Sequence, residues 1–365
     1  NNRTALSMTS SNNFVLLGAE QNGVYVSSDS GTNWYQTPFK EARVASIANS
    51  DSTLLCGTYG NGIYYSSNSG NTWIQSYKSQ LSNDIVDIVS YTNFAIAAIS
   101  SSSSPILRST NYGKSWTGIA PGETYGIFSL YYFNNLLFAG SAEGGIYKST
   151  NNGLNWIRKE INPPQEVFAI CSVDSILFAG TFYNGVFRSD DDGNSWYQTA
   201  LNIKQVNALA GSNGILYAGT SDDGVYKSTD YGLSWTQTSL NSNYIFSLII
   251  HQNSVLAATQ NNGLYVSLDQ GNTWFQKNDG LYNNPTIADL TIKDDLLFSA
   301  TTKSIWKRAL NEIKKVENDK EFILDEFRLE QNYPNPFNPT TKIKFTIPQN
   351  PPSSPFTKGG SGDSP

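Results

Sequence analysis

Charged residues are scarce in this chain: Asp, Glu, Lys and Arg make up only 15% of its 365 residues, against about 25% in an average soluble domain. The formal net charge is −6, so we expect no basic surface that would neutralise nucleic-acid phosphates. No apolar run approaches the ~20 residues that cross a bilayer. We therefore predict neither a nucleic-acid partner nor a membrane span.

Metal-binding and thiol-bearing residues are also few. The single histidine, His251, cannot build a multi-histidine centre, and Cys56 and Cys171 are too few for a disulfide framework or a zinc site. We expect two buried free thiols, and we predict no metal and no cofactor. The chain begins NNRTALSMTS, without an initiator methionine or a signal peptide, so we expect a processed or partial chain.

Rings and turn-forming residues are abundant by contrast. Aromatic residues reach 13%, and there are 29 glycines, a composition typical of short strands joined by tight turns. Seven segments repeat the pattern S-x-[D/N]-x-G-x-x-W, hereafter the box. The box tryptophans recur with a period close to 40 residues, and they are Trp34, Trp73, Trp116, Trp156, Trp196, Trp235 and Trp274.

Each repeat reads as four short strands. In one repeat these are VASIAN (44–49), LLCGT (54–58), GIYYS (62–66) and the stretch that begins at Trp73. Four strands at a period of about 40 residues predict one blade of a β-propeller. The first two strands occur eight times but the box only seven times, because the eighth unit ends with Arg308 in place of the box serine. We predict an all-β, single β-propeller of about eight four-stranded blades, or seven if a terminal unit is incomplete.

The box itself has the chemistry of a turn. Its Asp or Asn can accept hydrogen bonds from backbone N–H groups two residues on, its Gly supplies a positive φ, and its Trp can be buried between neighbouring sheets. A metal site or a catalytic carboxylate would not tolerate the exchange of Asp for Asn between repeats. We therefore predict a structural role for Asp29, Asn68, Asn111, Asn151, Asp191, Asp230 and Asp269.

The boxes resemble the Asp boxes, or BNR repeats, of the β-propellers found in sialidases, sortilin-type receptors, xyloglucanases and photosystem II assembly factors. The resemblance covers residues 5–308. It implies the propeller fold, with the boxes between third and fourth strands. It says little about activity, because this architecture hosts both enzymes and binding proteins.

We predict that the chain is divided into four segments. Residues 1–310 form the propeller, 311–328 a charged linker, and 349–365 a low-complexity tail. Residues 329–348 contain YPNPFNP and resemble the start of the type A C-terminal sorting domain of the type IX secretion system of Bacteroidetes-like bacteria. Residues 341–347 alternate like a strand. The motif residues are Tyr333, Pro334, Asn335, Pro336, Phe337, Asn338 and Pro339.

This resemblance implies a secreted or cell-surface protein that engages the secretion machinery through its C-terminal segment. The sorting family continues with further strands, whereas this chain runs into NPPSSPFTKGGSGDSP. The segment is therefore predicted to be a truncated sorting domain.

Two enzyme classes place different demands on the sequence. A sialidase needs three converging arginines, but only Arg3 and Arg43 are placed to reach the central funnel, so we do not expect that activity. A glycoside hydrolase needs only two carboxylates about 5–10 Å apart, and the face opposite the boxes offers acidic residues. No catalytic residue is assigned.

The ligand-binding candidates lie in the loops of that opposite face, where rings and polar side chains occur together. They are Tyr59, Tyr125, Tyr183, Tyr244, Arg43, Glu123 and Asp222. We predict a non-catalytic binding or scaffold module for an unknown carbohydrate or protein. The alternatives are a hydrolase that uses funnel-face carboxylates, and a protein whose repeats serve only self-assembly.

Overall fold

The computed structural model describes residues 5–313 with internal gaps, and residues 328–329 and 345–346. The gaps fall at 11–13, 20–22, 40–42, 51–52, 79–83, 92–93, 123–125, 203, 280, 282–283, 294 and 302–304. The chain forms two compact units, residues 1–314 and residues 315–365.

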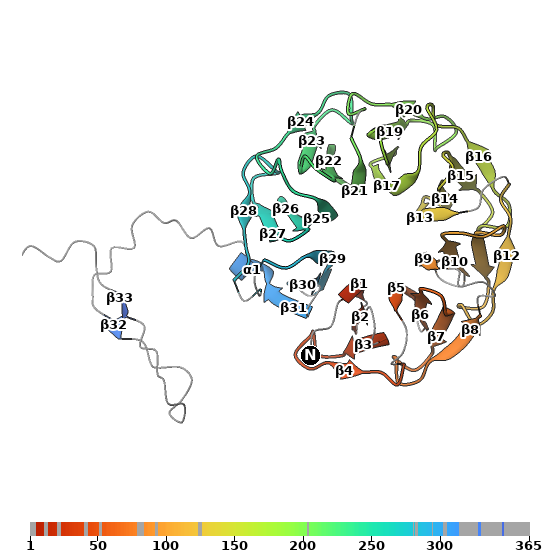
Figure 1. Cartoon of the computed structure of the whole chain (residues 1–365), viewed down its shortest axis with the longest axis horizontal. Coiled ribbons are helices and arrows are strands. Elements are labelled where there is room, and N and C mark those ends of the chain that lie inside the picture. The colour runs from red at the N-terminus through yellow and green to blue at the C-terminus, as the bar shows by residue number, and fades with distance from the viewer. Residues whose placement is uncertain are drawn as a thin grey trace, which may run out of the picture. The chain divides into compact units, whose positions relative to one another are not determined.

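Eight antiparallel sheets, numbered here as blades 1 to 8 in chain order, stand side by side in a ring (Figure 1). In seven blades four strands follow one another in sequence order, and in blade 8 the described residues form three strands. The predicted eight-bladed all-β propeller is confirmed.

The first strand of each blade is innermost (Figure 1). The inner strands are β1 (Ala5–Ser10), β5 (Val44–Ser50), β9 (Ile85–Tyr91), β13 (Ile127–Phe133), β17 (Val167–Val173), β21 (Val206–Ser212), β25 (Ile245–His251) and β29 (Ile287–Lys293). The second strands are β2 (Val15–Ala19), β6 (Thr53–Thr58), β10 (Phe94–Ile99), β14 (Leu136–Ser141), β18 (Ile176–Thr181), β22 (Ile215–Thr220), β26 (Ser254–Thr259) and β30 (Leu296–Thr301).

The third and fourth strands are shorter and lie toward the outer wall. The third strands are β3 (Gly23–Ser27), β7 (Gly62–Ser66), β11 (Ile106–Ser109), β15 (Ile146–Ser149), β19 (Val186–Ser189), β23 (Val225–Ser228), β27 (Gly263–Ser267) and β31 (Ile305–Ala309). The fourth strands are β4 (Tyr35–Gln36), β8 (Ile74–Tyr77), β12 (Thr117–Ile119), β16 (Ile157–Lys159), β20 (Tyr197–Gln198), β24 (Thr236–Gln237) and β28 (Phe275–Gln276). Edge strands this short offer little template for uncontrolled strand pairing.

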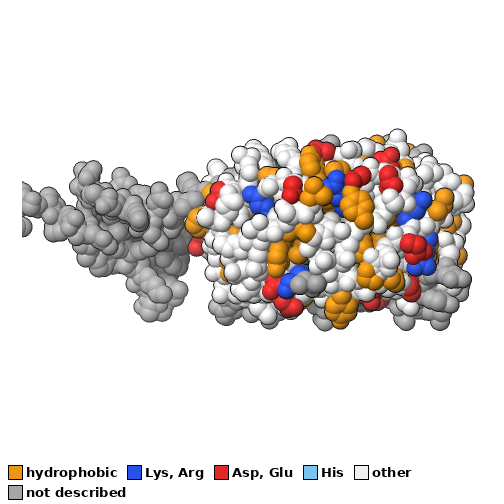
Figure 2. Space-filling view, turned by 90° about the horizontal axis from the view of Figure 1, so that it is seen from above, with side chains coloured by type: hydrophobic (Ala, Val, Ile, Leu, Met, Phe, Trp, Pro, Cys, Tyr) orange, Lys and Arg blue, Asp and Glu red, His pale blue; other side chains and the backbone are white. Residues whose placement is uncertain are grey.

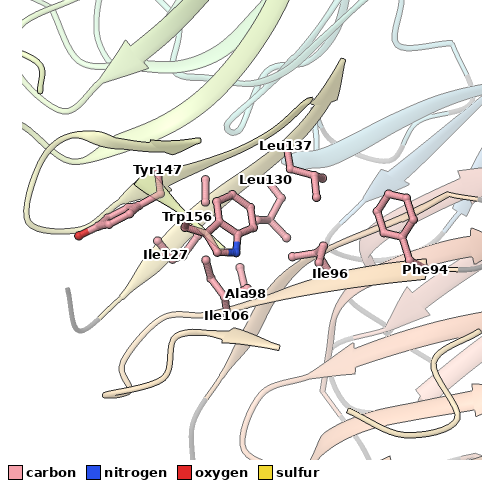
Figure 3. Close-up of a cluster of buried hydrophobic side chains, with 10 residues drawn as sticks. Phe94, Ile96, Ala98, Ile106, Ile127, Leu130, Leu137, Tyr147 and Trp156 are labelled. Atoms are coloured by element: carbon pink, nitrogen blue, oxygen red, sulfur yellow. The ribbon is translucent and has the colours of Figure 1, made fainter. Parts of the chain in front are cut away.

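The core is divided among the contacts between neighbouring blades. Second strands are almost wholly buried because a blade packs on both of its faces, and eight hydrophobic clusters fill the eight contacts. Figure 3 shows the cluster between blades 3 and 4, with Ile96 and Ile106 from one blade and Leu130 and Trp156 from the other. Cys56 and Cys171 are buried free thiols, as predicted.

The box turn is built from side chain to backbone, as blade 4 illustrates. The Ser149 hydroxyl donates to Asn151 Oδ1 at 3.0 Å and accepts from the Gly153 N–H at 3.0 Å. Asn151 Oδ1 also accepts from the Asn155 N–H at 2.9 Å, and the Trp156 indole N–H donates to the Gly153 carbonyl at 3.0 Å. The acceptor therefore reaches the N–H four residues on, not two as we expected, because the intervening turn brings that N–H back over the side chain.

Blade 8 has no box, and its chain enters a short helix, α1 (Leu310–Ile313), directly after β31. Leu310 and Ile313 are buried in the cluster between blades 7 and 8. The ring closes through side chains: the Met8 N–H donates to Asp289 Oδ2 at 2.9 Å. Blade 8 therefore meets blade 1 without exchange of a strand among the described residues.

The second unit is described only at two short strands. Arg328–Leu329 (β32) pairs antiparallel with Phe345–Thr346 (β33). Residues 345–346 belong to the stretch 341–347 that the sequence predicts as a strand. The sorting-motif residues Tyr333 to Pro339 lie outside the described residues.

Candidate binding face

The loops opposite the boxes form one face of the propeller, hereafter the loop face. Antiparallel strands place the second-to-third-strand loops and the connections between blades at this end. In blades 2 to 7 the residue after the second strand donates its N–H to the residue before the inner strand; examples are Tyr59 to the Arg43 carbonyl at 2.9 Å, Phe182 to Glu166 at 3.1 Å and Gln260 to Tyr244 at 3.0 Å. The predicted candidates Arg43 and Tyr244 thus stand at equivalent points of blades 2 and 7.

Two of the candidates form a direct pair. The Arg43 guanidinium carbon lies 4.3 Å from the centroid of the Tyr59 ring, within the range of a cation–π contact. Arg43 is exposed and Tyr59 is half-buried. One face of the Tyr59 ring is therefore occupied by a residue of the same chain.

A row of four rings, hereafter the aromatic row, crosses blades 4 and 5 on the loop face. The Phe128 and Phe168 centroids are 5.6 Å apart, Phe168 and Phe182 are 5.6 Å apart, and Phe182 and Tyr183 are 4.0 Å apart. The first three rings are half-buried, whereas 62% of the Tyr183 surface is exposed. The row therefore ends on a ring that is open to solvent.

The inner strands explain how Phe128 and Phe168 reach this row. Each is the second residue of its strand, and the pairing register of both strands shifts between the first and third residues. Such a bulge leaves the second residue out of the ladder and turns its side chain. We predicted Tyr183 but missed these two phenylalanines; the signal was Phe at a position where blades 2, 3, 6 and 8 have Ala, Val or Asn and where blade 7 also has a phenylalanine, Phe246.

The remaining candidates are dispersed. Tyr244 contacts Phe246 with centroids 4.6 Å apart in blade 7. Asp222 is exposed in blade 6, beside Asp223, which forms an ion pair with Lys204. Glu123 and Tyr125 lie outside the described residues. The structure thus joins Arg43 to Tyr59 and places Tyr183 in the aromatic row, and it shows Tyr244 and Asp222 on separate blades.

Two half-buried carboxyl groups lie on inner strands rather than in the loops. Burial raises the pKa of Asp87 and of Asp289 to about 6, although backbone N–H groups donate to both and lower the pKa in part. Asp87 Oδ2 accepts from the Leu130 N–H of the next blade at 2.8 Å, as Asp289 accepts from Met8. These carboxyl groups hold adjacent inner strands together.

The pKa of the box carboxylates is shifted in the opposite direction. The backbone and side-chain N–H groups of Asn33 hold the pKa of Asp29 down at about 2. The box aspartates are therefore ionised acceptors in closed turns. Within the described ranges, no group of three or more His, Cys, Asp or Glu residues is arranged to hold a metal ion, and no helix is long and apolar enough to cross a membrane.

The outer wall differs from the loop face. Five fourth strands begin with an exposed apolar or aromatic residue, and these residues are Tyr35, Ile74, Ile157, Tyr197 and Phe275. Figure 2 shows the wall with apolar side chains set between acidic and basic ones. The wall therefore carries separate apolar and aromatic side chains, one on each of these strands, whereas the loop face carries a row of rings in contact with one another.

Comparison with known proteins identifies the fold. The family described as "DUF6242 beta propeller domain" matches residues 164–287. No curated protein matches the sequence. The crystal structure of the computationally designed Ika8 protein is similar, with 14% identity, a TM-score of 0.68, and 85% of this chain and 97% of that chain covered.

Natural propellers are similar as well. YCF48 from Cyanidioschyzon merolae has 14% identity and a TM-score of 0.57, with 85% of this chain and 96% of that chain covered. YCF48 bound to D1 peptide has 17% identity and a TM-score of 0.56, with 84% and 93% covered. At these identities the likeness concerns the fold, which is consistent with a binding or scaffold module.

Proposed function

We propose that this chain is a secreted or cell-surface binding module without catalytic activity, and that its loop face holds a carbohydrate or a protein ligand. The observation that carries the proposal is Tyr183, a ring that is 62% exposed at the end of a packed aromatic row. A large exposed ring with one face supported by other rings is suited to stacking on a sugar or on an apolar side chain.

The loop that presents Tyr183 is held rigidly. The Thr181 hydroxyl donates to the Gly185 carbonyl at 3.0 Å and accepts from the Asn184 N–H at 3.2 Å. The Gln198 amide of the fourth strand donates to the Asn184 carbonyl at 3.0 Å. A loop already ordered in this way loses little conformational entropy on binding, which favours affinity.

The rival glycoside hydrolase requires an accessible pair of carboxylates, one of them with a raised pKa. Among the described aspartates, those with a raised pKa are Asp87 and Asp289. Each already accepts a backbone hydrogen bond from a neighbouring blade. Occupied acceptors on inner strands suit a structural role, so the binding module is the better account.

The contacts of two arginines argue against sialidase activity. Arg108 Nε donates to the Asn152 carbonyl at 2.6 Å, and Arg188 donates to the Tyr231 carbonyl at 2.8 Å. Both carbonyls belong to the box of the next blade. These guanidinium groups connect blades and do not converge on a substrate carboxylate.

One further observation supports a protein as the ligand, and another supports a location outside the cell. YCF48, a propeller of similar fold, has been solved with a bound peptide, and by analogy a protein ligand is one class to test here. The YPNPFNP motif of the C-terminal segment resembles a secretion signal of the type IX system, which supports export through that machinery.

The test is an unbiased screen of the full chain against immobilised polysaccharides and extracellular proteins. Wild-type chain, Tyr183→Ala and Tyr197→Ala are compared, since Tyr197 is an exposed ring on the outer wall of the same blade. We expect a retained ligand, roughly tenfold weaker binding by Tyr183→Ala, and unchanged binding by Tyr197→Ala. Turnover of a polysaccharide would contradict the non-catalytic proposal.

A further inference from the structure

The opposite face of the propeller, hereafter the box face, carries a second aromatic cluster. It lies at the hairpins between inner and second strands, and these hairpins stand beside the boxes: the Tyr231 hydroxyl of one box donates to Asp174 of such a hairpin at 2.8 Å. The cluster belongs to blades 3 and 4. It contains none of the loop-face candidates.

Two tyrosines form its surface. The ring centroids of Tyr91 and Tyr132 are 4.5 Å apart with an interplanar angle of 33°. Phe94 supports both rings, at 6.0 Å from Tyr91 and 5.8 Å from Tyr132. Half of the Tyr91 surface is open to solvent. We name Tyr91, Phe94, Tyr132 and the adjacent turn residues Asn134 and Asn135 the tyrosine platform.

The platform stands on a rigid base. Phe94 is buried and belongs to the cluster between blades 3 and 4, at one end of it in Figure 3. The Tyr132 hydroxyl donates to Asn135 Oδ1 at 2.9 Å. Asn134 and Asn135 have φ values of 49° and 62° and form the two-residue hairpin turn, a backbone that such turns require and Asn tolerates.

The two tyrosine rings are not a feature that the blades repeat. Five other blades close the equivalent hairpin without a ring of this kind at the position of Tyr91, with Ser50, Val173, Ser212, His251 and Lys293, whereas blade 4 has Phe133 there. At the position of Tyr132 the other blades have Ser10, Asn49, Ser90, Ser172, Gly211, Ile250 and Ile292. In a repeat protein, a side chain that departs from what its structurally equivalent neighbours need calls for a reason outside blade packing.

The chemistry of the platform is neutral throughout. Its rings carry hydroxyl groups, and its exposed polar side chains are the amides of Asn134 and Asn135. An aromatic face beside amide donors and acceptors matches the apolar face and the hydroxyl groups of a sugar. An acidic or basic ligand would meet no opposite charge among these five residues.

We propose that the tyrosine platform is a binding site for neutral carbohydrate, distinct from the loop-face site. The sugar stacks on Tyr91, and Asn134 and Asn135 bond its hydroxyl groups. Because the two sites lie on opposite faces of the ring, ligands at both are held at once. This site stands independently of the proposed function of the loop face.

The experiment is calorimetric titration of the full chain with four neutral probes: cellohexaose, xylohexaose, mannohexaose and laminarihexaose. Hexagalacturonate is the charged control. We expect at least one neutral hexaose to bind, with about tenfold loss of affinity in Tyr91→Ala and little change in Tyr91→Phe. Tyr183→Ala leaves this binding unchanged, which separates the two sites.

The variant Tyr91→Ser guards against a folding artefact, because serine occupies this position in blades 2 and 6. It should melt like the wild type and lose binding like Tyr91→Ala. Absence of binding by all four neutral hexaoses, tighter binding of hexagalacturonate, or full affinity in both Tyr91→Ala and Tyr91→Ser would each overturn the proposal.

Discussion

At the scale of single residues, the fold requires glycine in the box for two separate reasons. Gly193 has a φ of +77°, and a β-carbon there would lie 2.4 Å from the Phe138 ring of the preceding blade. The first reason follows from the turn and is predictable from the sequence. The second comes from the neighbouring blade and appears only once the blades are packed.

A pair of substitutions separates these reasons. Gly60 has almost the same φ, +78°, with nothing within 4 Å of a β-carbon. We expect Gly60→Ala to lower the free energy of unfolding by about 1 kcal/mol through backbone strain, and Gly193→Ala by about 2–4 kcal/mol because overpacking adds to it. Urea unfolding measures both. Equal losses would show that the close approach to Phe138 has no energetic consequence.

At the scale of elements, carboxyl groups join neighbouring inner strands. Asp289 of β29 accepts the Met8 N–H of β1 and thereby links the last blade to the first. Burial raises its pKa from 3.8 to about 6. The folded state thus binds a proton more tightly than the unfolded state, and this group's stabilising contribution, present below pH 4, is lost as the pH rises through 6.

The variant Asp289→Asn removes that dependence. Asparagine keeps an acceptor for the Met8 N–H and carries no charge at any pH, so we expect the variant to match the wild type near pH 4 and to be more stable near pH 7. The difference reaches up to about 3 kcal/mol, at 1.36 kcal/mol per pKa unit. Melting temperatures from pH 4 to pH 8 measure it. A variant less stable than the wild type at pH 7 would contradict the assignment.

The elements also show where sequence reasoning stops. The period of about 40 residues predicted four strands per blade, and the box predicted the turn between third and fourth strands. The bulges that turn Phe128 and Phe168 out of their ladders could not be predicted, because they depend on pairing across strands. For the same reason we predicted Tyr183 as a candidate but missed Phe128 and Phe168, the two inner-strand rings of its row.

At the scale of the whole molecule, apolar packing and hydrogen bonds between blades 8 and 1 close the ring. Phe298 of blade 8 is fully buried against blade 1, with its centroid 6.3 Å from that of Trp34. Phe138 occupies the equivalent strand position in blade 4 and is also fully buried. The sequence left the closure of the last blade open, since its eighth unit lacks the box.

If the contact between blades 8 and 1 is as stable as the other contacts between blades, Phe298 and Phe138 contribute equally to the free energy of unfolding. We expect Phe298→Ala and Phe138→Ala each to lower the free energy of unfolding by about 3–5 kcal/mol, the usual cost of such a cavity, and to agree within about 1 kcal/mol. Denaturant unfolding measures this. A much smaller loss for Phe298→Ala would indicate a contact between blades 8 and 1 that opens readily.

The central claim is that the exposed end of the aromatic row binds the ligand of this module. Its most direct test is the dissociation constant of a retained carbohydrate or protein, measured for wild-type chain, Tyr183→Ala and Tyr197→Ala. The account predicts a loss of about tenfold for Tyr183→Ala and none for Tyr197→Ala. Equal affinities of all three proteins, or a loss confined to Tyr197→Ala, would contradict it.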